Sequence, residues 1–222
     1  TDEDLFDLEM EYIFEKTWIF ACHESQVPNP HDYYAITVGR QPLLITRDEK
    51  GELHALVNSC SHRGSMLTRL CKGNKRTFVC PFHGWSYKMS GELINVKAPE
   101  GYDESFEKSE RGLQKVLVES YRGFVFVNLD SKAEQNLEAF LGDTKFAFDM
   151  MLEQSTGDEL EVIPGNSRYT YDGNWKLQIE NGLDGYHVST VHFNYVATIQ
   201  NRAKLDAENN PTNKKETLDY SK

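Results

Sequence analysis

The fold of this 222-residue chain is decided by two short stretches, Cys60-Ser61-His62-Arg63-Gly64 and Cys80-Pro81-Phe82-His83-Gly84-Trp85. Each stretch offers one thiolate and one imidazole, so together they form a four-ligand set of mixed softness. Zinc binds two cysteines and two histidines tetrahedrally, whereas a two-iron cluster can carry the cysteines on one iron and the histidines on the other. The number of ligands alone therefore leaves both metals open.

The spacing of these ligands favours the two-iron cluster. Zinc sites with this ligand set usually pair cysteine with cysteine and histidine with histidine within each arm. Here Cys60 shares its arm with His62, and Cys80 shares its arm with His83. Mixed arms suit a cluster whose two irons are reached by alternate ligands of each loop.

The remaining cysteines carry a weaker signal. Four cysteines could form two disulfides, but the acidic amino terminus does not resemble an export signal, and metal binding is the better interpretation. Cys71 lies between the two arms and Cys22-His23 lies upstream. We interpret them as buried cysteines and a hydrogen-bonded histidine, and we assign none of them to a metal.

Net charge and hydropathy exclude several classes of partner. The formal net charge of −11 argues against nucleic acid and against an anionic membrane surface, since both favour clustered Lys and Arg. No apolar run approaches the roughly 20 residues that span a bilayer. We therefore expect a cytoplasmic protein with neither a nucleic-acid nor a membrane partner.

A second candidate metal site lies in the segment 180–192, which concentrates carboxylate, amide and imidazole groups. On a helix Asp184 and His187 share a face, whereas His192 converges on them only if the helix bends. Two histidines and one carboxylate on one face of an iron leave positions open for dioxygen, as in non-haem Fe(II) oxygenases. The same residues also fit an ordinary amphipathic helix, and they allow Asp184 as the third ligand.

Residue periodicity gives a coarse map of the secondary structure. It predicts helices over 5–14 and 137–152, a strand over 168–175, and a helix from 176 to about 195 that loosens near Gly182 and Gly185. The polar composition after Gln200 predicts an exposed loop. Short β-type runs separated by turn signals predict a compact antiparallel domain between 18 and 130. The clearest runs are 33–38, 43–47, 77–79, 116–119 and 124–129.

The two metal motifs together resemble one family. The arms at Cys60 and Cys80 resemble the Rieske signature of ring-hydroxylating oxygenases, and the segment 180–192 resembles the mononuclear-iron motif of the same family. The resemblance implies a Rieske [2Fe-2S] cluster, a mononuclear Fe(II) and an electron bridge to a Rieske histidine of a neighbouring subunit. The implied residues are Cys60, His62, Cys80 and His83 for the cluster, His187 and His192 for the iron, and Asp184 for the bridge.

The resemblance also implies a fold and a domain organisation. The expected fold is α+β, with an antiparallel β Rieske domain and the first part of an α/β-mixed antiparallel-sheet catalytic domain. We assign 1–16 to an N-terminal helix belonging with the catalytic part, 17–130 to the Rieske domain and 131–222 to the start of the mononuclear-iron domain. The family takes its third iron ligand from a later segment, so the chain is expected to be partial.

Three segments, 172–176, 180–192 and 217–222, are most similar to the large subunits of the benzoate and anthranilate dioxygenase group. This similarity implies cis-dihydroxylation of an aromatic carboxylate, with anthranilate giving catechol, in aromatic catabolism. It also implies NADH as the electron source through a separate flavin and iron–sulfur reductase, a small beta subunit, and a trimer of large subunits. The alternatives are benzoate or another ring acid as substrate, a Rieske electron carrier without oxygenase activity, and a zinc-binding interaction module.

Overall fold

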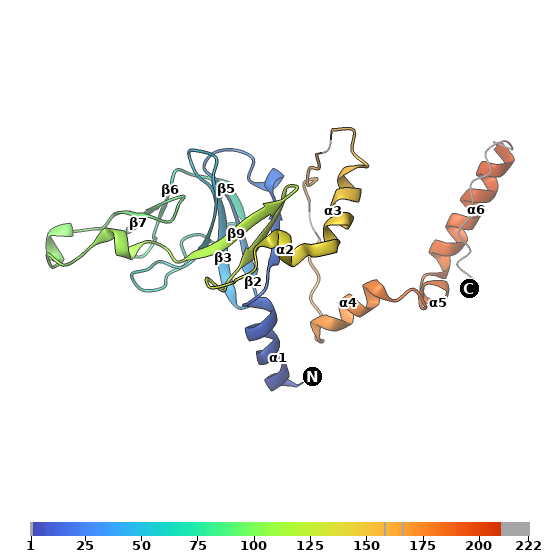
Figure 1. The fold of residues 1–222 in the computed structure, drawn as a ribbon, viewed down its shortest axis with the longest axis horizontal. Coiled ribbons are helices and arrows are strands. Elements are labelled where there is room, and N and C mark those ends of the chain that lie inside the picture. Colours follow the sequence, from blue (N-terminus) through green and yellow to red (C-terminus); the bar gives the residue numbers. More distant parts are fainter. Residues whose placement is uncertain (1, 158, 166, 210–222) are drawn as a thin grey trace. The chain divides into compact units, whose positions relative to one another are not determined.

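The computed structural model describes residues 2–157, 159–165 and 167–209. The chain forms two compact units, residues 2–166 and 167–222 (Figure 1). The first unit is built on antiparallel sheets, and the described residues of the second unit form helices. The domain boundary that we expect at residue 130 stays a prediction.

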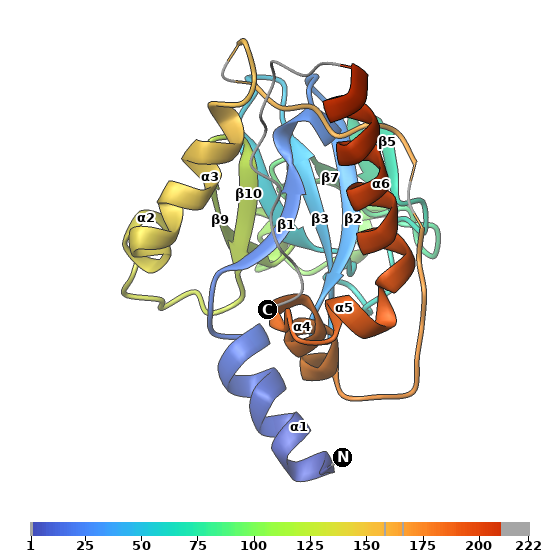
Figure 2. The same cartoon turned by 90° about the vertical axis from the view of Figure 1, so that its right-hand side faces the viewer.

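A seven-stranded antiparallel sheet forms the body of the first unit, with the strand order β1-β10-β9-β4-β3-β2-β5 (Figure 2). The β9–β10 hairpin turns through Arg122 and Gly123, whose φ angles of 52° and 86° match a two-residue primed turn. The strands of this sheet are β1 Ile19–His23, β2 Asp32–Val38, β3 Gln41–Arg47, β4 Leu53–Val57, β5 Lys72–Asn74, β9 Lys115–Tyr121 and β10 Phe124–Asn128. The strands predicted over 33–38, 43–47, 116–119 and 124–129 are confirmed as β2, β3, β9 and β10.

A smaller antiparallel sheet consists of β6 Thr77–Val79, β7 Ser86–Lys88 and β8 Leu93–Asn95. β3 is an interior strand of the seven-stranded sheet, and its successive residues Leu43, Leu44 and Ile45 are all buried. Successive side chains of a strand point to opposite faces, so both faces of β3 are covered. Leu44 packs in one apolar cluster, whereas Leu43 and Ile45 pack in another. The Leu44 cluster also contains residues of the small sheet and the two cysteines Cys60 and Cys80. The core between the two sheets therefore anchors one end of the first candidate site.

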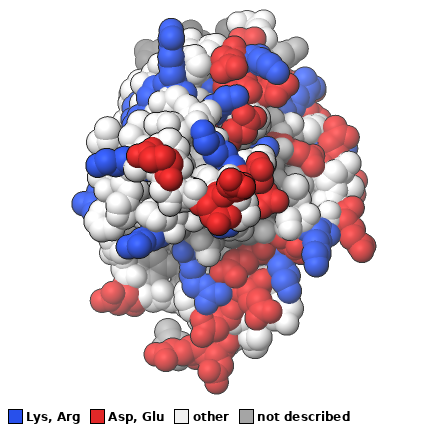
Figure 3. Space-filling view, turned by 90° about the vertical axis from the view of Figure 1, so that its left-hand side faces the viewer, with Lys and Arg blue, Asp and Glu red and all other residues white. Residues whose placement is uncertain are grey.

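The surface of the first unit carries charges of both signs. Figure 3 looks onto the side of the molecule that lies at the left in Figure 1, where β6 and β7 of the small sheet are labelled. Acidic and basic side chains are interspersed on this face, and they do not form one continuous basic area. No helix in the described part of the chain is long and apolar enough to cross a membrane.

Along the chain of the first unit, helices precede the first strand and follow the last strand of the large sheet. The helix predicted over 5–14 is confirmed as α1 Glu3–Glu9 followed by a π-helical turn, Met10–Phe14. The helix predicted over 137–152 is present as α2 Leu137–Leu141 and α3 Lys145–Leu152, joined by a 3₁₀ turn, Gly142–Thr144. Gly142 has a φ of 49°, which a regular α-helix does not allow, so the chain changes direction there. Further 3₁₀ turns are Glu24–Gln26, Pro99–Gly101 and Lys108–Arg111.

The second unit contains α4 Trp175–Leu183, α5 Val188–Val191 and α6 Phe193–Asn209. The predicted loosening of the helix near Gly182 and Gly185 is confirmed, because α4 ends between them. The strand predicted over 168–175 is wrong: residues 168–172 pair with no strand, and α4 begins at its end. Asn174 caps this helix by accepting the Lys176 N–H at 2.9 Å, a local contact that outweighs β propensity when no partner strand is available.

The loop predicted after Gln200 is also wrong as far as Asn209, because α6 continues to that residue. The segment is polar, but it contains Ala203, Lys204 and Leu205, which are good helix formers. The remainder of the predicted loop, residues 210–222, lies outside the described residues.

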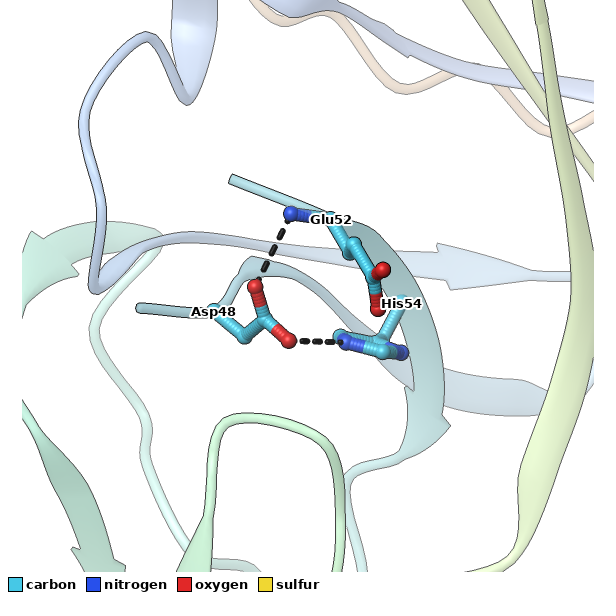
Figure 4. A group of neighbouring side chains, drawn as sticks. All are labelled: Asp48, Glu52 and His54. Carbon is cyan, nitrogen blue, oxygen red and sulfur yellow. Dashed lines mark hydrogen bonds and ion pairs between the residues drawn. The ribbon is translucent and has the colours of Figure 1, made fainter. Parts of the chain in front are cut away.

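Asp48 organises the turn between β3 and β4. Its Oδ1 accepts the N–H groups of Lys50 and Glu52, each at 2.9 Å, and its Oδ2 lies 3.1 Å from Nε2 of His54 (Figure 4). Burial by itself raises the pKa of Asp48, but the hydrogen bonds from His54, Glu52 and Lys50 outweigh it and hold the pKa below its usual range. The ionised carboxylate therefore stabilises the hairpin.

Replacement of Asp48 by asparagine is expected to lower the free energy of unfolding by about 1–3 kcal/mol at neutral pH, because the amide cannot accept all of these bonds. The depressed folded-state pKa means that the carboxylate stabilises the fold above its unfolded pKa of about 3.9. This contribution is lost as the pH falls through the folded-state pKa, so the two proteins should converge in acid.

Urea unfolding at neutral and acidic pH measures both effects. The matched control is Glu49→Gln, because Glu49 is an exposed acid in the same turn. Its change should stay within about 0.5 kcal/mol. Equal unfolding midpoints for the wild type and Asp48→Asn at neutral pH would contradict the role of Asp48.

Candidate metal sites

Two loops of the first unit carry the four predicted cluster ligands. Cys60 follows β4, and Cys80 directly follows β6. In each loop the glycine four residues after the cysteine donates its N–H to the cysteine carbonyl, Gly64 to Cys60 at 2.8 Å and Gly84 to Cys80 at 2.9 Å. Both glycines have positive φ angles, 73° and 75°, which other residues rarely adopt. The two loops thus share one tight turn, and each turn presents a cysteine and a histidine.

The four donor groups form a buried cysteine end and a more open histidine end. Cys60 and Cys80 are each 2% exposed, whereas His62 and His83 are half-buried. The two histidine Nδ1 atoms lie 3.1 Å apart, which is close enough for both to bind one metal ion. This convergence fits a cluster whose histidines share an iron.

Hydrogen bonds at the cysteine end favour a bound thiolate. Burial by itself raises the pKa of Cys80, but the backbone N–H groups of Phe82 and His83 hold it below its usual value. At Cys60 burial dominates and raises the pKa, although the Tyr87 hydroxyl and the His62 N–H act in the opposite direction. The loops therefore aim donors at both sulfurs, as a metal-bound thiolate requires.

The distances between ligands separate a cluster from a single zinc ion. A tetrahedral zinc holds its donor atoms within about 4 Å of one another. Among the described residues, no three of the four loop ligands have donor atoms that all lie within 4.8 Å of one another. Asp48, Glu52 and His54 do form such a group. The loop ligands are therefore too widely spread for one ion, whereas the Asp48 carboxylate already serves the hairpin.

Trp85 supports the histidine end. Its ring stacks on His62 with the ring centroids 4.9 Å apart and the planes 13° apart, and its Nε1 donates to the Tyr102 hydroxyl at 3.2 Å. Trp85 is 3% exposed, so the His62 ring rests on a fixed surface. Sequence reasoning did not find this contact, because the two residues lie on different loops.

The other cysteines and His23 lie away from these donors. Cys22 is 1% exposed, as predicted, and His23 accepts the Ser25 N–H at Nδ1. The prediction of a buried Cys71 is wrong, since this side chain is exposed. It directly precedes the short edge strand β5, where little of the chain covers it.

The second candidate site lies where the helices of the second unit are interrupted. Asp184 follows α4, His187 precedes α5, and His192 stands between α5 and α6. Oδ2 of Asp184 lies 2.8 Å from Nδ1 of His187, and the rings of His187 and His192 are 5.1 Å apart between centroids. The interruption supplies the bend that the spacing of the histidines requires.

Asp184 orients His187. A hydrogen bond from the His187 ring, followed in strength by one from the Tyr186 N–H, lowers the pKa of the Asp184 carboxyl. The carboxylate therefore accepts from Nδ1 and leaves Nε2 of His187 available to a metal. Asp184, His187 and His192 do not form a group with all donors within 4.8 Å, so the geometry favours Asp184 as a partner of His187 over a third ligand. The bridge to a neighbouring subunit stays a prediction.

These two sites define a class of protein that couples an iron–sulfur cluster to a non-haem iron. Residues 17–121 match the Rieske [2Fe-2S] domain family, and residues 158–219 match the catalytic domain of the ring-hydroxylating alpha subunit. The chain therefore belongs to the ring-hydroxylating oxygenase alpha subunits. Membership implies a Rieske cluster and a mononuclear iron as cofactors, and the ligand sets described above fit both.

Relatives match the whole of this chain or most of it. The large subunit of anthranilate 1,2-dioxygenase from Acinetobacter baylyi is 58% identical over 222 residues, which cover 100% of this chain and 47% of that protein. The alpha subunit of toluate 1,2-dioxygenase from Pseudomonas putida is 53% identical and is matched over 93% of this chain and 46% of its own length. The chain thus spans about half the length of the curated relatives that it matches.

A solved structure supports the fold. The crystal structure of naphthalene 1,2-dioxygenase from Rhodococcus sp. bound to indole superposes with a TM-score of 0.83 at 37% identity. The match covers 88% of this chain and 45% of that chain. The expected α+β class with an antiparallel Rieske sheet is therefore confirmed.

Proposed function

We propose that this chain belongs to a terminal oxygenase that passes electrons from a Rieske cluster to a mononuclear Fe(II) and cis-dihydroxylates an aromatic carboxylate, with anthranilate as the substrate. The observation that carries the substrate class is a gradient of similarity. Relatives named for anthranilate, toluate and 2-halobenzoate are 58%, 53% and 50% identical, whereas those named for chlorobenzene and benzene are 36% identical. Identity is highest where the ring of the named substrate carries a carboxylate.

The residues of the two sites divide the work. When bound, the cluster supplies electrons one at a time and the mononuclear iron supplies a site for dioxygen. Cys60 and Cys80 hold the buried end of the cluster, and the half-buried His62 and His83 form its outlet toward the surface. His187 and His192 hold the iron. Asp184 fixes the orientation of His187 and links it to a Rieske histidine of a neighbouring subunit.

The overall reaction sets the partners. Converting the anthranilate anion to catechol consumes dioxygen, two electrons and three protons, and it releases ammonia and carbon dioxide. The electrons come from NADH through a separate flavin and iron–sulfur reductase. The complete protein assembles as a trimer of large subunits with a small beta subunit, in which residues 1–16 and 131–222 belong to the catalytic part and residues 17–130 to the Rieske domain. We place it in the cytoplasm, which cell fractionation tests.

Product analysis tests the proposal. The complete large subunit, assembled with its small subunit and reductase, is expected to convert anthranilate to catechol and ammonia in equal amounts. Its kcat/KM for anthranilate should exceed that for benzoate by at least about tenfold. The polar groups of the pocket that hydrogen-bond the amino group of anthranilate have no partner when benzoate binds. Chromatography of the products and an ammonia assay give both quantities.

The alternative functions predict different outcomes. Preferred dihydroxylation of benzoate would assign the protein to benzoate instead. Reduction of the cluster by NADH without any product from a ring acid would indicate an electron carrier. A colourless protein that contains zinc alone would remove the cluster and the oxygenase together.

A further inference from the structure

The connection between β8 and β9, residues 96–114, contacts both ligand loops of the first candidate site. It is drawn largely in green at the left of Figure 1. Near its start, the Tyr102 hydroxyl accepts the Nε1–H of Trp85, a residue of the second ligand loop, at 3.2 Å. Near its other end, the Arg111 carbonyl accepts the hydroxyl of Ser61, a residue of the first ligand loop, at 2.7 Å. One segment of the chain therefore holds both loops.

Two aromatic rings of this connection pack against Trp85. The Phe106 ring meets the indole edge-on, with the centroids 5.8 Å apart, and the rings of Tyr102 and Phe106 lie 4.4 Å apart. Both rings are partly buried against the apolar cluster that contains Trp85. Because Trp85 itself stacks on His62, the contacts run without a break from the connection to a proposed cluster ligand.

The second histidine is held differently. The His83 ring meets the ring of Phe82 edge-on, with the centroids 4.5 Å apart, and Phe82 is 67% exposed. The ring that stacks on His62 is that of Trp85, which is 3% exposed. The position of His62 therefore depends on a buried indole, and the position of the indole depends on the connection.

We propose that the connection 96–114 is a clamp that retains the cluster, with Tyr102 as the positioning residue that holds the Trp85 indole against His62. The proposal rests on the proposed role of His62 as a cluster ligand. In the closed clamp the buried indole N–H donates to Tyr102, and in an open clamp water can accept it. Loss of the Tyr102 hydroxyl penalises the closed form alone, so the histidine end should open more often.

The test is the rate at which excess EDTA bleaches the visible spectrum of the cluster in the complete holoprotein. Tyr102→Phe retains the ring and removes the acceptor. Its iron and sulfide contents should equal those of the wild type, but its bleaching rate should rise about tenfold, because a buried donor left without a partner shifts the balance between closed and open forms by about this factor.

Two further variants separate the clamp from a general loss of stability. Tyr121→Phe makes the same chemical change at another half-buried tyrosine of the first unit, whose hydroxyl donates to Asp149 at 3.1 Å. It should bleach at the wild-type rate. In the background of Trp85→Phe, which has no indole N–H, Tyr102→Phe should cause little further change, since the two side chains act through one hydrogen bond.

Each outcome decides the proposal. A wild-type bleaching rate in Tyr102→Phe overturns it, and so does an equal acceleration in Tyr121→Phe. If Tyr102→Phe takes up no cluster, Phe106→Leu decides, because it keeps the hydroxyl and loses only the edge contact with the indole: faster bleaching supports the clamp, and a wild-type rate overturns it. A wild-type protein without any cluster overturns the proposed function as well, which distinguishes the two failures.

Discussion

Replacement of Cys80 by alanine is expected to abolish the visible spectrum of the [2Fe-2S] cluster in the complete protein. Cys80 is one of the two sulfur ligands in our proposal, and the backbone N–H groups of Phe82 and His83 favour its thiolate. Alanine supplies no ligand, and water cannot replace it readily in a site that is 2% exposed. The iron content should fall by about two atoms per chain, as metal analysis and the absorption spectrum will show.

Cys71→Ala is the matched control for this variant. Cys71 is also a free cysteine of the first unit, but it is exposed and is absent from the ligand set. Its spectrum and iron content should equal those of the wild type. If Cys80→Ala retained the full spectrum, or if Cys71→Ala lost it, the assignment of the cluster ligands would be wrong.

Replacement of His187 by alanine should remove the mononuclear iron while the cluster spectrum persists. His187 and His192 are two ligands of this iron in our proposal, and Asp184 holds the His187 ring at 2.8 Å. Loss of one ligand is expected to lower ring oxidation by more than about 100-fold, since changes to outer residues alone cost 10–100-fold. Iron analysis and product formation measure the two effects, and Ser189→Ala, an exposed neighbour in α5, is the control.

Asp184→Asn provides a contrast to that variant. It should retain both metals, because asparagine can still accept a hydrogen bond from the His187 ring. Electron transfer from the reduced cluster should slow by about 10–100-fold, because a neutral amide replaces the anionic link between histidines. Single-turnover oxidation of the pre-reduced protein reports this rate, and an unchanged rate would remove Asp184 from the pathway.

The prediction for His187→Ala has its own contradicting outcome. Full ring-oxidation activity in that variant would refute the assignment of His187 to the iron site.

The secondary structure was predictable where the residues of a single strand or helix carry the pattern that identifies it. The periodicity of residues 33–38 and 43–47 gave β2 and β3, and Gly182 and Gly185 marked the interruption after α4. The strand predicted over 168–175 failed because a strand is completed by a partner elsewhere, which local propensity does not reveal. The loop predicted after Gln200 failed because polarity was weighted above helix propensity.

The candidate ligands were predictable from the sequence by itself, because thiolate and imidazole chemistry and the short spacing within each arm are local properties. The pairing of Cys60 with His62 and of Cys80 with His83 can be recognised without knowledge of the fold. The tertiary structure alone decided how these arms meet: the two Nδ1 atoms 3.1 Å apart, the His62–Trp85 stack, and the Tyr87 hydroxyl on Sγ of Cys60. These contacts join residues on different loops and strands. They exist because sheet pairing and a shared core bring distant segments of the chain together, so no local pattern encodes them.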